Sequence, residues 1–407
     1  MHGDTRITYA HLNRRVERMA AGFQLRGLRP RQRVVVQLPN VPEFVVTVFA
    51  LMRVGAVPVF CPVSHRTPEV SHVVRVAEAV GHVGPSTYQG FDHTAMVADI
   101  AAQGPFPRRA FTYEAPGTAS PYGGLTTDVS GCHYFPLGSL DSPPERARAH
   151  SADQVAFFLL SGDTAMAPRL VPRTHNDYAY QARAAAELVS LTEDDVYLAA
   201  LPAEHNFTFG CPGIVGTLSV GGTVVLAEDP DPAACLPVVA RERVTLTSLS
   251  PADARLWLDA LTTVRSDLSS LRLLQLTGSP PQPAAAARVG ARVSAELGCR
   301  LQQVFGTAEG LLTLTRPGDP EETVLTTQGR PLSPDDEIRI VGTDGNDVPD
   351  GDPGELLARG PYTPRGYFRA PDLNARRFTP DGYFRTGCVA RRTPDGNLAV
   401  TGRLDRR

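Results

Sequence analysis

The sequence predicts an α/β fold built on largely parallel sheets, followed by a smaller β-rich part. Three observations predict it: continuous apolar runs, amphipathic segments between them, and a late change to short strands separated by Asp-Gly turns. Continuous apolar strands that alternate with helices are typical of parallel sheets covered on both faces. With 407 residues, of which 42% are hydrophobic, the chain can bury a large core and divide into two or three compact units.

Short apolar runs recur from Arg33 to Gly306 and are predicted to be buried strands. In chain order they read VVVQL, VPVFCPV, VAFFLLS, VYLAAL, TVVLAE, TLTSLS, LRLLQLTG and LQQVFG. Amphipathic segments such as Glu43 to Val54 and Asn176 to Leu188 lie between the runs and are predicted to be helices. The longest apolar stretch, Phe44 to Cys61, contains an arginine, a glycine and a proline, so we expect a buried helix followed by a strand and not a membrane span.

The remaining segments divide the chain. The stretch from Gly104 to Pro144 is rich in proline, glycine and serine and is predicted to be a long loop region. From Gly329 to Gly402 the turn sequences GTDGNDVPDGDPG, TPDGYF and TPDGNL separate short strands, which indicates an antiparallel or barrel-like unit. We therefore predict an α/β core of two interwoven subdomains over residues 1–328 and a β-rich, barrel-like subdomain over residues 329–402.

Charge and cysteine content narrow the class of protein. The formal net charge is −3 and no basic run occurs, so the sequence offers no electrostatic basis for binding nucleic acid or a membrane surface. The six cysteines form no CxxC pair, and no charged-then-apolar leader precedes the first predicted helix, so we expect a reduced, cytoplasmic protein without a structural zinc. All 40 basic residues are arginine, so this chain alone supplies no lysine ammonium to a mechanism.

The stretch SGDTAMAPRLVPRTHNDY, residues 161–178, begins like a phosphate-binding loop. Backbone that wraps a polyphosphate needs glycines, because a Cβ blocks close approach and left-handed φ angles are costly for other residues. Between Ser161 and Arg169, Gly162 is the only glycine. The sequence therefore raises the question of whether a nucleotide-using fold has lost part of its nucleotide chemistry.

A set of segments in fixed order carries a resemblance to a known family. They are ITYAHLNRRVERMAAGF, FALMRVGAVPVF, LVPRTHNDY, LPAEHNFTFGCPG, QQVFGTAEGLL, GELLARGPYTPRGYFRAPDLNARRFTPDGYFRTG and GRLD. With them the chain resembles, almost end to end, the large N-terminal domain of the adenylate-forming superfamily. The arylate branch is the most similar, namely the 2,3-dihydroxybenzoate- and salicylate-AMP ligases of siderophore pathways.

The resemblance implies a chemistry and its cofactors. In this family ATP and Mg²⁺ convert an aryl carboxylic acid to an acyl adenylate, and the acyl group then passes to a thiol, for example on a carrier protein. A small C-terminal domain with a catalytic lysine follows the hinge in the family. This chain stops at residues 403–407, which match that hinge, so we expect the small domain to be absent from it.

The aryl-binding side of the family site is matched by EHNFTFGCPG and its surroundings. The candidate substrate-binding residues are Asn206, Phe207, Cys211, Gly278 and Leu312. The resemblance implies that Asn206 hydrogen-bonds the ring hydroxyl or carboxylate and that Phe207 packs on the ring. An apolar wall of Cys211 and Leu312 favours salicylate-like acids, because a second hydroxyl would stay unpaired there, although both could be ordinary core residues. His205 is either a catalytic residue or a packed imidazole.

The resemblance also assigns nucleotide contacts. Phe305 matches the aromatic residue that stacks on adenine, and Glu309 in TAEG matches the magnesium ligand, which makes it a catalytic candidate together with Arg169. The other residues that match nucleotide contacts are Ser161, Gly162, Thr164, Gly306, Thr307, Cys388 and Arg403. Arg173 is also family-like, but a surface hydrogen bond explains it without catalysis.

Several of these positions depart from the family pattern. Asp163 would place a carboxylate near a polyphosphate, at a cost of about 3 kcal/mol for roughly 5 Å and an effective dielectric near 20. Met166 adds bulk, Pro168 removes a backbone donor, and Arg169 replaces the family's lysine. Cys388 stands where the family has the aspartate that binds both ribose hydroxyls. These substitutions all predict weaker nucleotide binding.

Two hypotheses of different classes follow. The first is an arylate-AMP ligase, weak or assisted by a separate small domain, in which Glu309 holds magnesium and Thr164 and Arg169 contact phosphates. The second is a repurposed relative that needs no ATP and either transfers or condenses a preactivated aryl-acyl thioester, or only binds a ligand. A serine hydrolase and a dinucleotide-binding enzyme are disfavoured, because the sequence contains no GxSxG elbow and no GxGxxG after the first strand.

Overall fold

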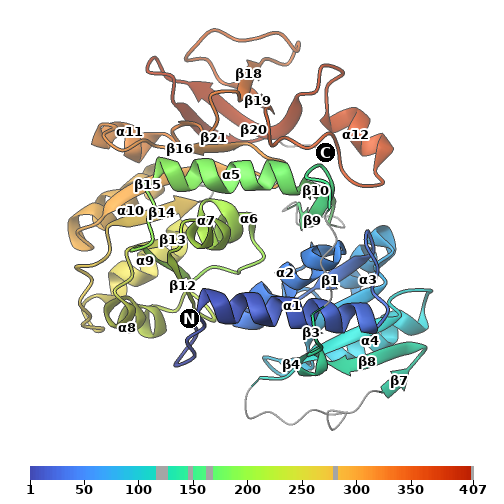
Figure 1. Cartoon of the computed structure of the whole chain (residues 1–407). Coiled ribbons are helices and arrows are strands. Elements are labelled where there is room, and N and C mark those ends of the chain that lie inside the picture. Colours follow the sequence, from blue (N-terminus) through green and yellow to red (C-terminus); the bar gives the residue numbers. More distant parts are fainter. Residues whose placement is uncertain (116–126, 145–149, 162–167, 278–282, 405–407) are drawn as a thin grey trace. The chain divides into compact units, whose positions relative to one another are not determined.

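The computed structural model describes the chain except for residues 116–126, 145–149, 162–167, 278–282 and 405–407. The described residues form two compact units, each of which combines helices with sheets (Figure 1). Unit 1 comprises Met1–Asn176 and Tyr367–Arg369, and unit 2 comprises Asp177–Gly366 and Ala370–Arg407. The predicted α/β class is confirmed.

Unit 1 is built on an eight-stranded sheet. Its strands are β1 (Arg33–Val36), β2 (Val57–Phe60), β3 (Gly81–Pro85), β6 (Arg109–Tyr113), β7 (Thr127–Val129), β8 (Cys132–Pro136), β9 (Val155–Leu160) and β10 (Leu170–Thr174). Strands β4 (Thr87–Tyr88) and β5 (Phe91–Asp92) form a separate small hairpin. The order across the sheet is β10-β9-β2-β1-β3-β6-β8-β7. Pairing is parallel from β9 to β8 and antiparallel at the edge pairs β10–β9 and β8–β7.

The helices of unit 1 pack against this sheet and one another. They are α1 (Tyr9–Leu25), α2 (Pro42–Val54), α3 (Thr67–Ala77), α4 (His93–Ala102) and the short 3-10 helix η1 (Leu137–Ser139). Helix α2 contacts α1 and β2, so the longest apolar stretch does form a buried helix followed by a strand. Among the described residues, every helix falls short of the length and apolarity that a membrane crossing requires.

A short segment from late in the chain belongs to unit 1. The amide of Phe368 donates to the carbonyl of Leu170 on β10 at 3.0 Å, and its ring lies 5.0 Å from the ring of Phe158. Arg369 donates to the carboxylate of Glu78 at 2.7 Å. The backbone bond covers part of an edge strand, which would otherwise present an unpaired carbonyl.

Unit 2 contains a seven-stranded sheet with the order β12-β11-β13-β14-β15-β16-β17. These strands are β11 (Val196–Ala199), β12 (Thr223–Leu226), β13 (Leu246–Leu249), β14 (Leu273–Thr277), β15 (Arg300–Gly306), β16 (Leu312–Leu314) and β17 (Arg330–Pro331). Strands β12 to β15 are parallel, and β16 and β17 complete the sheet in antiparallel pairing. The eight apolar runs of the sequence become β1, β2, β9 and β11 to β15, whereas the other strands of the two sheets were not among the predicted runs.

The helices of unit 2 lie along the chain between these strands. They are α5 (His175–Leu188, which begins in unit 1), α6 (Asn206–Gly210), α7 (Gly213–Ser219), α8 (Pro232–Glu242), α9 (Pro251–Ala260), α10 (Pro283–Glu296), α11 (Glu321–Thr326) and α12 (Pro371–Arg377). Helix α7 contacts β11 and β12, α9 contacts β13 and β14, and α10 contacts β15. In Figure 1 helices α8, α9 and α10 lie beside this sheet.

The β-rich part forms a four-stranded antiparallel sheet within unit 2. Its strands, in both chain and spatial order, are β18 (Glu337–Val341), β19 (Gly354–Arg359), β20 (Phe384–Arg392) and β21 (Leu398–Arg403). Gly345 and Gly396 lie in the predicted Asp-Gly turns with positive φ angles of 81°. Where a barrel-like closure was expected, the sheet is open, because β18 and β21 are its two edges.

The region from Gly104 to Pro144 differs from the loop that the sequence predicts. Strands β6, β7 and β8 fall inside it and extend one edge of the sheet in unit 1. Neighbouring strands supply hydrogen-bond partners along both edges of β6 and β8, and this tertiary pairing outweighs the local proline and glycine content. Residues 116–126 lie outside the described part of the chain.

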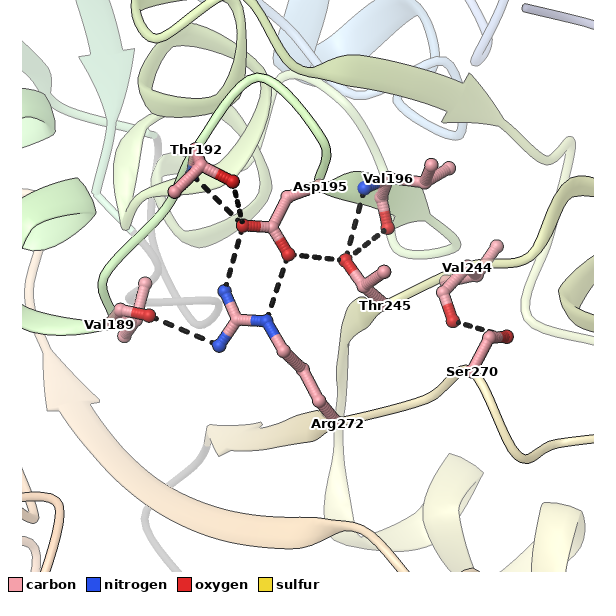
Figure 2. A network of polar contacts seen from close by, with 8 residues as sticks. All are labelled: Val189, Thr192, Asp195, Val196, Val244, Thr245, Ser270 and Arg272. Atoms are coloured by element: carbon pink, nitrogen blue, oxygen red, sulfur yellow. Dashed lines mark hydrogen bonds and ion pairs between the residues drawn. The ribbon is translucent and has the colours of Figure 1, made fainter.

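A polar network ties together the amino ends of neighbouring strands in unit 2 (Figure 2). Arg272, before β14, donates from Nε and a terminal nitrogen to the two carboxylate oxygens of Asp195, before β11, at 2.8 and 3.0 Å. The hydroxyl of Thr245, before β13, donates to the same carboxylate at 2.7 Å. Burial alone would raise the pKa of Asp195, but these bonds outweigh it and lower that pKa. The network fixes how β11, β13 and β14 align.

Candidate active site

The candidate residues of unit 2 follow the carboxyl ends of its parallel strands. Asn206 begins α6, which follows β11, and Thr307 and Glu309 follow β15. In open parallel sheets, ligands bind at the edge formed by the carboxyl ends of the strands. Gly278 follows β14 in the sequence and lies outside the described residues.

The side-chain amide of Asn206 is held by two separate parts of unit 2. The hydroxyl of Tyr178 on α5 donates to Oδ1 at 3.0 Å, and Nε2 of Gln181 on the same helix approaches this oxygen at 3.4 Å. Nδ2 of Asn206 makes a long contact of 3.4 Å with the backbone carbonyl of Thr307. Helix α5 and the segment after β15 therefore both orient this amide.

Gln181 is completely buried and links three groups around α6. Its Nε2 donates to the backbone carbonyl of Gly210 at 3.1 Å and to the sulfur of Cys211 at 3.3 Å. The thiol of Cys211 donates in turn to the backbone carbonyl of Asn206 at 3.4 Å. Cys211 is 1% exposed, so its sulfur is a packed, hydrogen-bonded group and not a surface thiol.

The residues predicted to line the aryl ring meet in one apolar cluster. Its buried members are Ala185, Phe207, Cys211, Val304, Leu312, Leu314, Leu332 and Tyr362. Phe207 comes from α6 and Leu312 from the start of β16, so segments far apart in sequence form the wall. The cluster lies against Asn206 through Cys211, which places a hydrogen-bonding amide at the border of an apolar surface.

His205 caps helix α6. Its Nδ1 accepts the backbone amide of Phe207 at 3.3 Å, so this nitrogen carries no proton and a neutral ring bears its proton on Nε2. The side chain is exposed to solvent, but desolvation by the surrounding protein nevertheless lowers the pKa of the imidazole. A neutral, capping His205 that carries its proton on Nε2 is therefore the form expected at pH 7.

Glu204, which precedes this cap, is a buried acid. Burial raises the pKa of its carboxyl to about 7, and its own backbone amide opposes this only in part. A carboxyl with that pKa is partly protonated at neutral pH. The sequence shows an acidic residue before His205 and Asn206, but gives no sign that it is buried.

The segment TAEG after β15 forms a tight turn. The amide of Gly310 donates to the carbonyl of Thr307 at 3.1 Å, and Gly310 adopts a φ of 112°. A Cβ at Gly310 would lie 2.2 Å from the carbonyl oxygen of Tyr362, so only glycine fits. The Thr307 hydroxyl is buried without a hydrogen-bond partner among the described residues, and Glu309 beside it is buried.

Cys388 lies on β20 opposite Arg403 on β21. It packs in an apolar cluster with Phe305 and Leu311, and both Cys388 and Phe305 are at most 5% exposed. Burial raises the pKa of the Cys388 thiol, the positive charge of Arg403 opposes this, and the negative charge of Glu309 adds to it. Cys388 therefore lies near Phe305 through the apolar cluster, opposite Arg403 on the neighbouring strand, and within the electrostatic influence of Glu309.

The loop that resembles a phosphate-binding loop belongs to unit 1 and connects β9 with β10. The amide of Ser161 donates to the carbonyl of Arg169 at 3.0 Å, and the amide of Arg169 donates to the hydroxyl of Ser161 at 3.2 Å. These bonds close the base of the loop. Gly162 and Thr164 lie outside the described residues.

Arg173 requires a correction. Sequence reasoning treats it as a surface residue, whereas the structure buries it completely on β10. A buried guanidinium is costly unless other groups satisfy it, so its role is internal. The burial was not expected because β10 is an edge strand, and the packing that buries Arg173 is tertiary and leaves no local sequence signal.

Tyr178 and Gln181 are site residues that sequence reasoning missed. They are three positions apart on α5, so they lie on the same side of the helix and reach the same amide. The available signal is a glutamine in the alanine-rich stretch AYQARAAA, since a polar residue on a buried face needs partners.

Comparison with known proteins shows the family of this chain. The family model described as AMP-binding enzyme matches residues 1–368. The chain is 42% identical over 401 residues to the 2,3-dihydroxybenzoate-AMP ligase of Bacillus subtilis, and the match covers 98% of this chain and 71% of that protein. It is 44% identical to the salicyl-AMP ligase / salicyl-S-ArCP synthetase of Mycobacterium tuberculosis, covering 98% of this chain and 68% of the relative.

A solved structure is similar over the whole chain. The apo structure of MbtA from Mycobacterium smegmatis has a TM-score of 0.89 and 44% sequence identity, and the match covers 100% of this chain and 72% of that one. The chain therefore has the fold of this solved structure, and its homologues include arylate-AMP ligases.

Proposed function

The chain belongs to the AMP-binding enzyme family, and we propose that it binds a salicylate-like aryl carboxylic acid, or an activated aryl-acyl derivative of one, in unit 2. The relatives that ligate 2,3-dihydroxybenzoate or salicylate to AMP support this substrate class. By the same relationship, the product would enter the assembly of a siderophore or a related natural product. A carrier protein or another thiol is the proposed acceptor.

The observation that carries the aryl part of the proposal is the position of Asn206 at the border of an apolar cluster. The amide provides a hydrogen bond to an acid or its hydroxyl, while Phe207, Cys211 and Leu312 supply apolar surface for a ring. Cys211 already uses its sulfur within the protein, so a second ring hydroxyl would find no partner there. Salicylate is therefore preferred over 2,3-dihydroxybenzoate.

Part of the nucleotide side fits the family chemistry. The buried carboxylate of Glu309 is a suitable ligand for Mg²⁺, and the unpartnered hydroxyl of Thr307 can donate to a phosphate oxygen. When bound, ATP and Mg²⁺ would supply the activated phosphoryl group that an acid needs to form a mixed anhydride. On this side, Glu309 would hold the Mg²⁺ and Thr307 would orient a phosphate oxygen.

The ribose side does not fit. Cys388 offers a buried thiol with a raised pKa, in an apolar cluster, where two hydroxyls need a carboxylate. Loss of a charged bidentate acceptor costs on the order of 3 kcal/mol, which is about a hundredfold in affinity. Together with Arg169 in place of a lysine and Asp163 in the loop, this predicts weak ATP binding. We therefore propose that acyl-adenylate formation by this chain alone is slow.

The lack of a ribose-binding carboxylate at Cys388 also favours a second candidate function. A protein that keeps an aryl site but lacks a ribose anchor could take a preactivated aryl-acyl thioester and transfer or condense its acyl group without ATP. A protein that only binds the aryl ligand is a variant of this candidate. Both retain the role of Asn206 and dispense with the role of Glu309.

Calorimetry on the intact chain distinguishes these functions. Salicylate, ATP and a non-hydrolysable salicyl-adenylate mimic are titrated separately, with 2,3-dihydroxybenzoate as the comparison acid. We expect salicylate to bind more tightly than 2,3-dihydroxybenzoate, and the adenosine part of the mimic to add little affinity. A mimic that binds far more tightly than salicylate, together with acid-dependent pyrophosphate exchange at rates ordinary for the relatives, would refute the weak-ATP part. Failure of every aryl acid to bind would refute the proposal as a whole.

A further inference from the structure

Two backbone carbonyls determine the orientation of the side-chain amides in the candidate site. A backbone carbonyl only accepts hydrogen bonds, so a side-chain amide atom that faces one must be the nitrogen. The carbonyl of Gly210 lies 3.1 Å from one end of the Gln181 amide, which identifies that end as Nε2. The atom of Asn206 that faces Nε2 of Gln181 is then an acceptor, Oδ1.

The second carbonyl gives the same answer independently. The other end of the Asn206 amide faces the carbonyl of Thr307 at 3.4 Å, so it is the nitrogen Nδ2. Tyr178 then acts as a donor, since its hydroxyl is 3.0 Å from Oδ1. A flipped Asn206 would oppose its oxygen to the Thr307 carbonyl and its amide hydrogens to those of Gln181.

The hydrogen-bonding capacity of Asn206 is therefore divided unequally. Oδ1 accepts from the Tyr178 hydroxyl, and its other side faces Nε2 of Gln181, whose two hydrogens are shared among Oδ1, the Gly210 carbonyl and the Cys211 sulfur. Of the two hydrogens on Nδ2, one points to Thr307, and the other has no partner among the described residues. Asn206 is only partly buried, so the residue keeps some accessible surface, and this second hydrogen is its remaining donor.

We propose that Tyr178 and Gln181 are positioning residues that hold Asn206 as a pure hydrogen-bond donor toward the ligand, and that this donor reads an oxygen ortho to the acid group. The inference rests on the proposed function, because it names how the aryl site recognises its substrate. A salicylate-type acid supplies the oxygen acceptor. A 2-aminobenzoate supplies N–H donors and a poor acceptor, so it leaves the Asn206 hydrogen unpaired.

Close packing makes this orientation rigid. Tyr178 is 4% exposed, and a Cβ at Gly210 would lie 2.4 Å from its hydroxyl oxygen, so glycine at this position makes room for the tyrosine. The ring of Phe209 packs at a tilt against it, with 5.7 Å between ring centroids. Tyr178 therefore has little freedom to redirect its hydroxyl.

The test compares Tyr178→Phe with the wild type in calorimetric titrations of salicylate and 2-aminobenzoate. A matched control is Tyr180→Phe, which removes the same hydroxyl from the same helix, where it bonds Ser333 at 2.6 Å and does not contact Asn206. The wild type is expected to prefer salicylate over 2-aminobenzoate by about tenfold or more. Tyr178→Phe is expected to lower that preference by about threefold to tenfold, while Tyr180→Phe leaves it unchanged.

Each outcome decides the inference. If Tyr178→Phe weakens both acids equally, its role is structural and the positioning proposal fails, even though the aryl site itself stands. If the wild type binds 2-aminobenzoate as tightly as salicylate, the proposed donor-only orientation of Asn206 is wrong. This comparison uses the wild type alone, so it does not depend on whether a variant folds. If the wild type binds no aryl acid, the proposed function fails and this inference fails with it.

Discussion

Replacing Glu204 with glutamine should remove a pH-dependent loss of stability. Burial raises the pKa of the Glu204 carboxyl from an ordinary 4.5 to about 7 in the folded protein. Between these values the folded state binds a proton that the unfolded state has released, so the free energy of unfolding falls as pH rises through this window and stays low above it. Each pKa unit corresponds to 1.36 kcal/mol, so the loss is on the order of 3 kcal/mol.

The assay is urea unfolding at pH 5 and pH 8.5, followed by the fluorescence of Trp257. It is the chain's single tryptophan and is completely buried on α9 in unit 2, the unit that contains Glu204. Glutamine is neutral at both pH values, so Glu204→Gln should be about 3 kcal/mol more stable relative to the wild type at pH 8.5 than at pH 5. Glu322→Gln, at an exposed position, serves as the control and should show no such difference.

The comparison of Glu204→Gln with the wild type can also refute the proposed burial of Glu204. All other titrating groups are common to wild type and variant, so their contributions cancel in the difference. If Glu204→Gln and the wild type lose stability in parallel between pH 5 and pH 8.5, then Glu204 is not held in a desolvated environment. The description of the turn before His205 would then be wrong.

Three further predictions follow from the same structure. Cys388→Asp should tighten ATP binding by up to about a hundredfold in calorimetry, because it supplies a carboxylate where ribose hydroxyls would bind, and unchanged affinity would contradict the proposed defect. Arg272→Met should cost about 2 kcal/mol in urea unfolding at pH 7, and the cost should shrink below about pH 4, because the lowered pKa of Asp195 contributes stability only while Asp195 is ionised. A cost independent of pH would argue against that ion pair. Gly310→Ala should destabilise unit 2 by more than about 1 kcal/mol, since its φ is 112° and a Cβ would clash with a carbonyl; a neutral effect would show that the turn can relax.

The sequence predicts β1, β2, β9 and β11 to β15 because each of them has a parallel neighbour in its sheet and a largely apolar sequence. The run TVVLAE, for example, becomes β12, in which three of four residues are buried. The region that became β6 to β8 was missed for the opposite reason. Its proline and glycine content indicates a loop, and only pairing with β3 and between the strands themselves makes it a sheet edge.

The sequence predicted those residues of the candidate site that lie in recognisable family motifs, and it did not predict the others. Asn206 and Glu309 were found because the segments around them resemble a family. Tyr178 and Gln181 lie on α5, some 25 residues or more from Asn206, and their roles depend on which face of that helix meets α6. The burial of Arg173 and Glu204 is likewise a property of tertiary packing, which no local pattern records.

The placement of Tyr367–Arg369 in unit 1 has a consequence for dissecting the gene. A fragment that ends at Asn176 would contain every strand of the eight-stranded sheet and would look like a complete folding module. It would nevertheless lack the partner of the Leu170 carbonyl, the ring against Phe158 and the guanidinium beside Glu78. Expression of residues 1–176 alone should therefore yield a polypeptide that aggregates more readily than the intact chain.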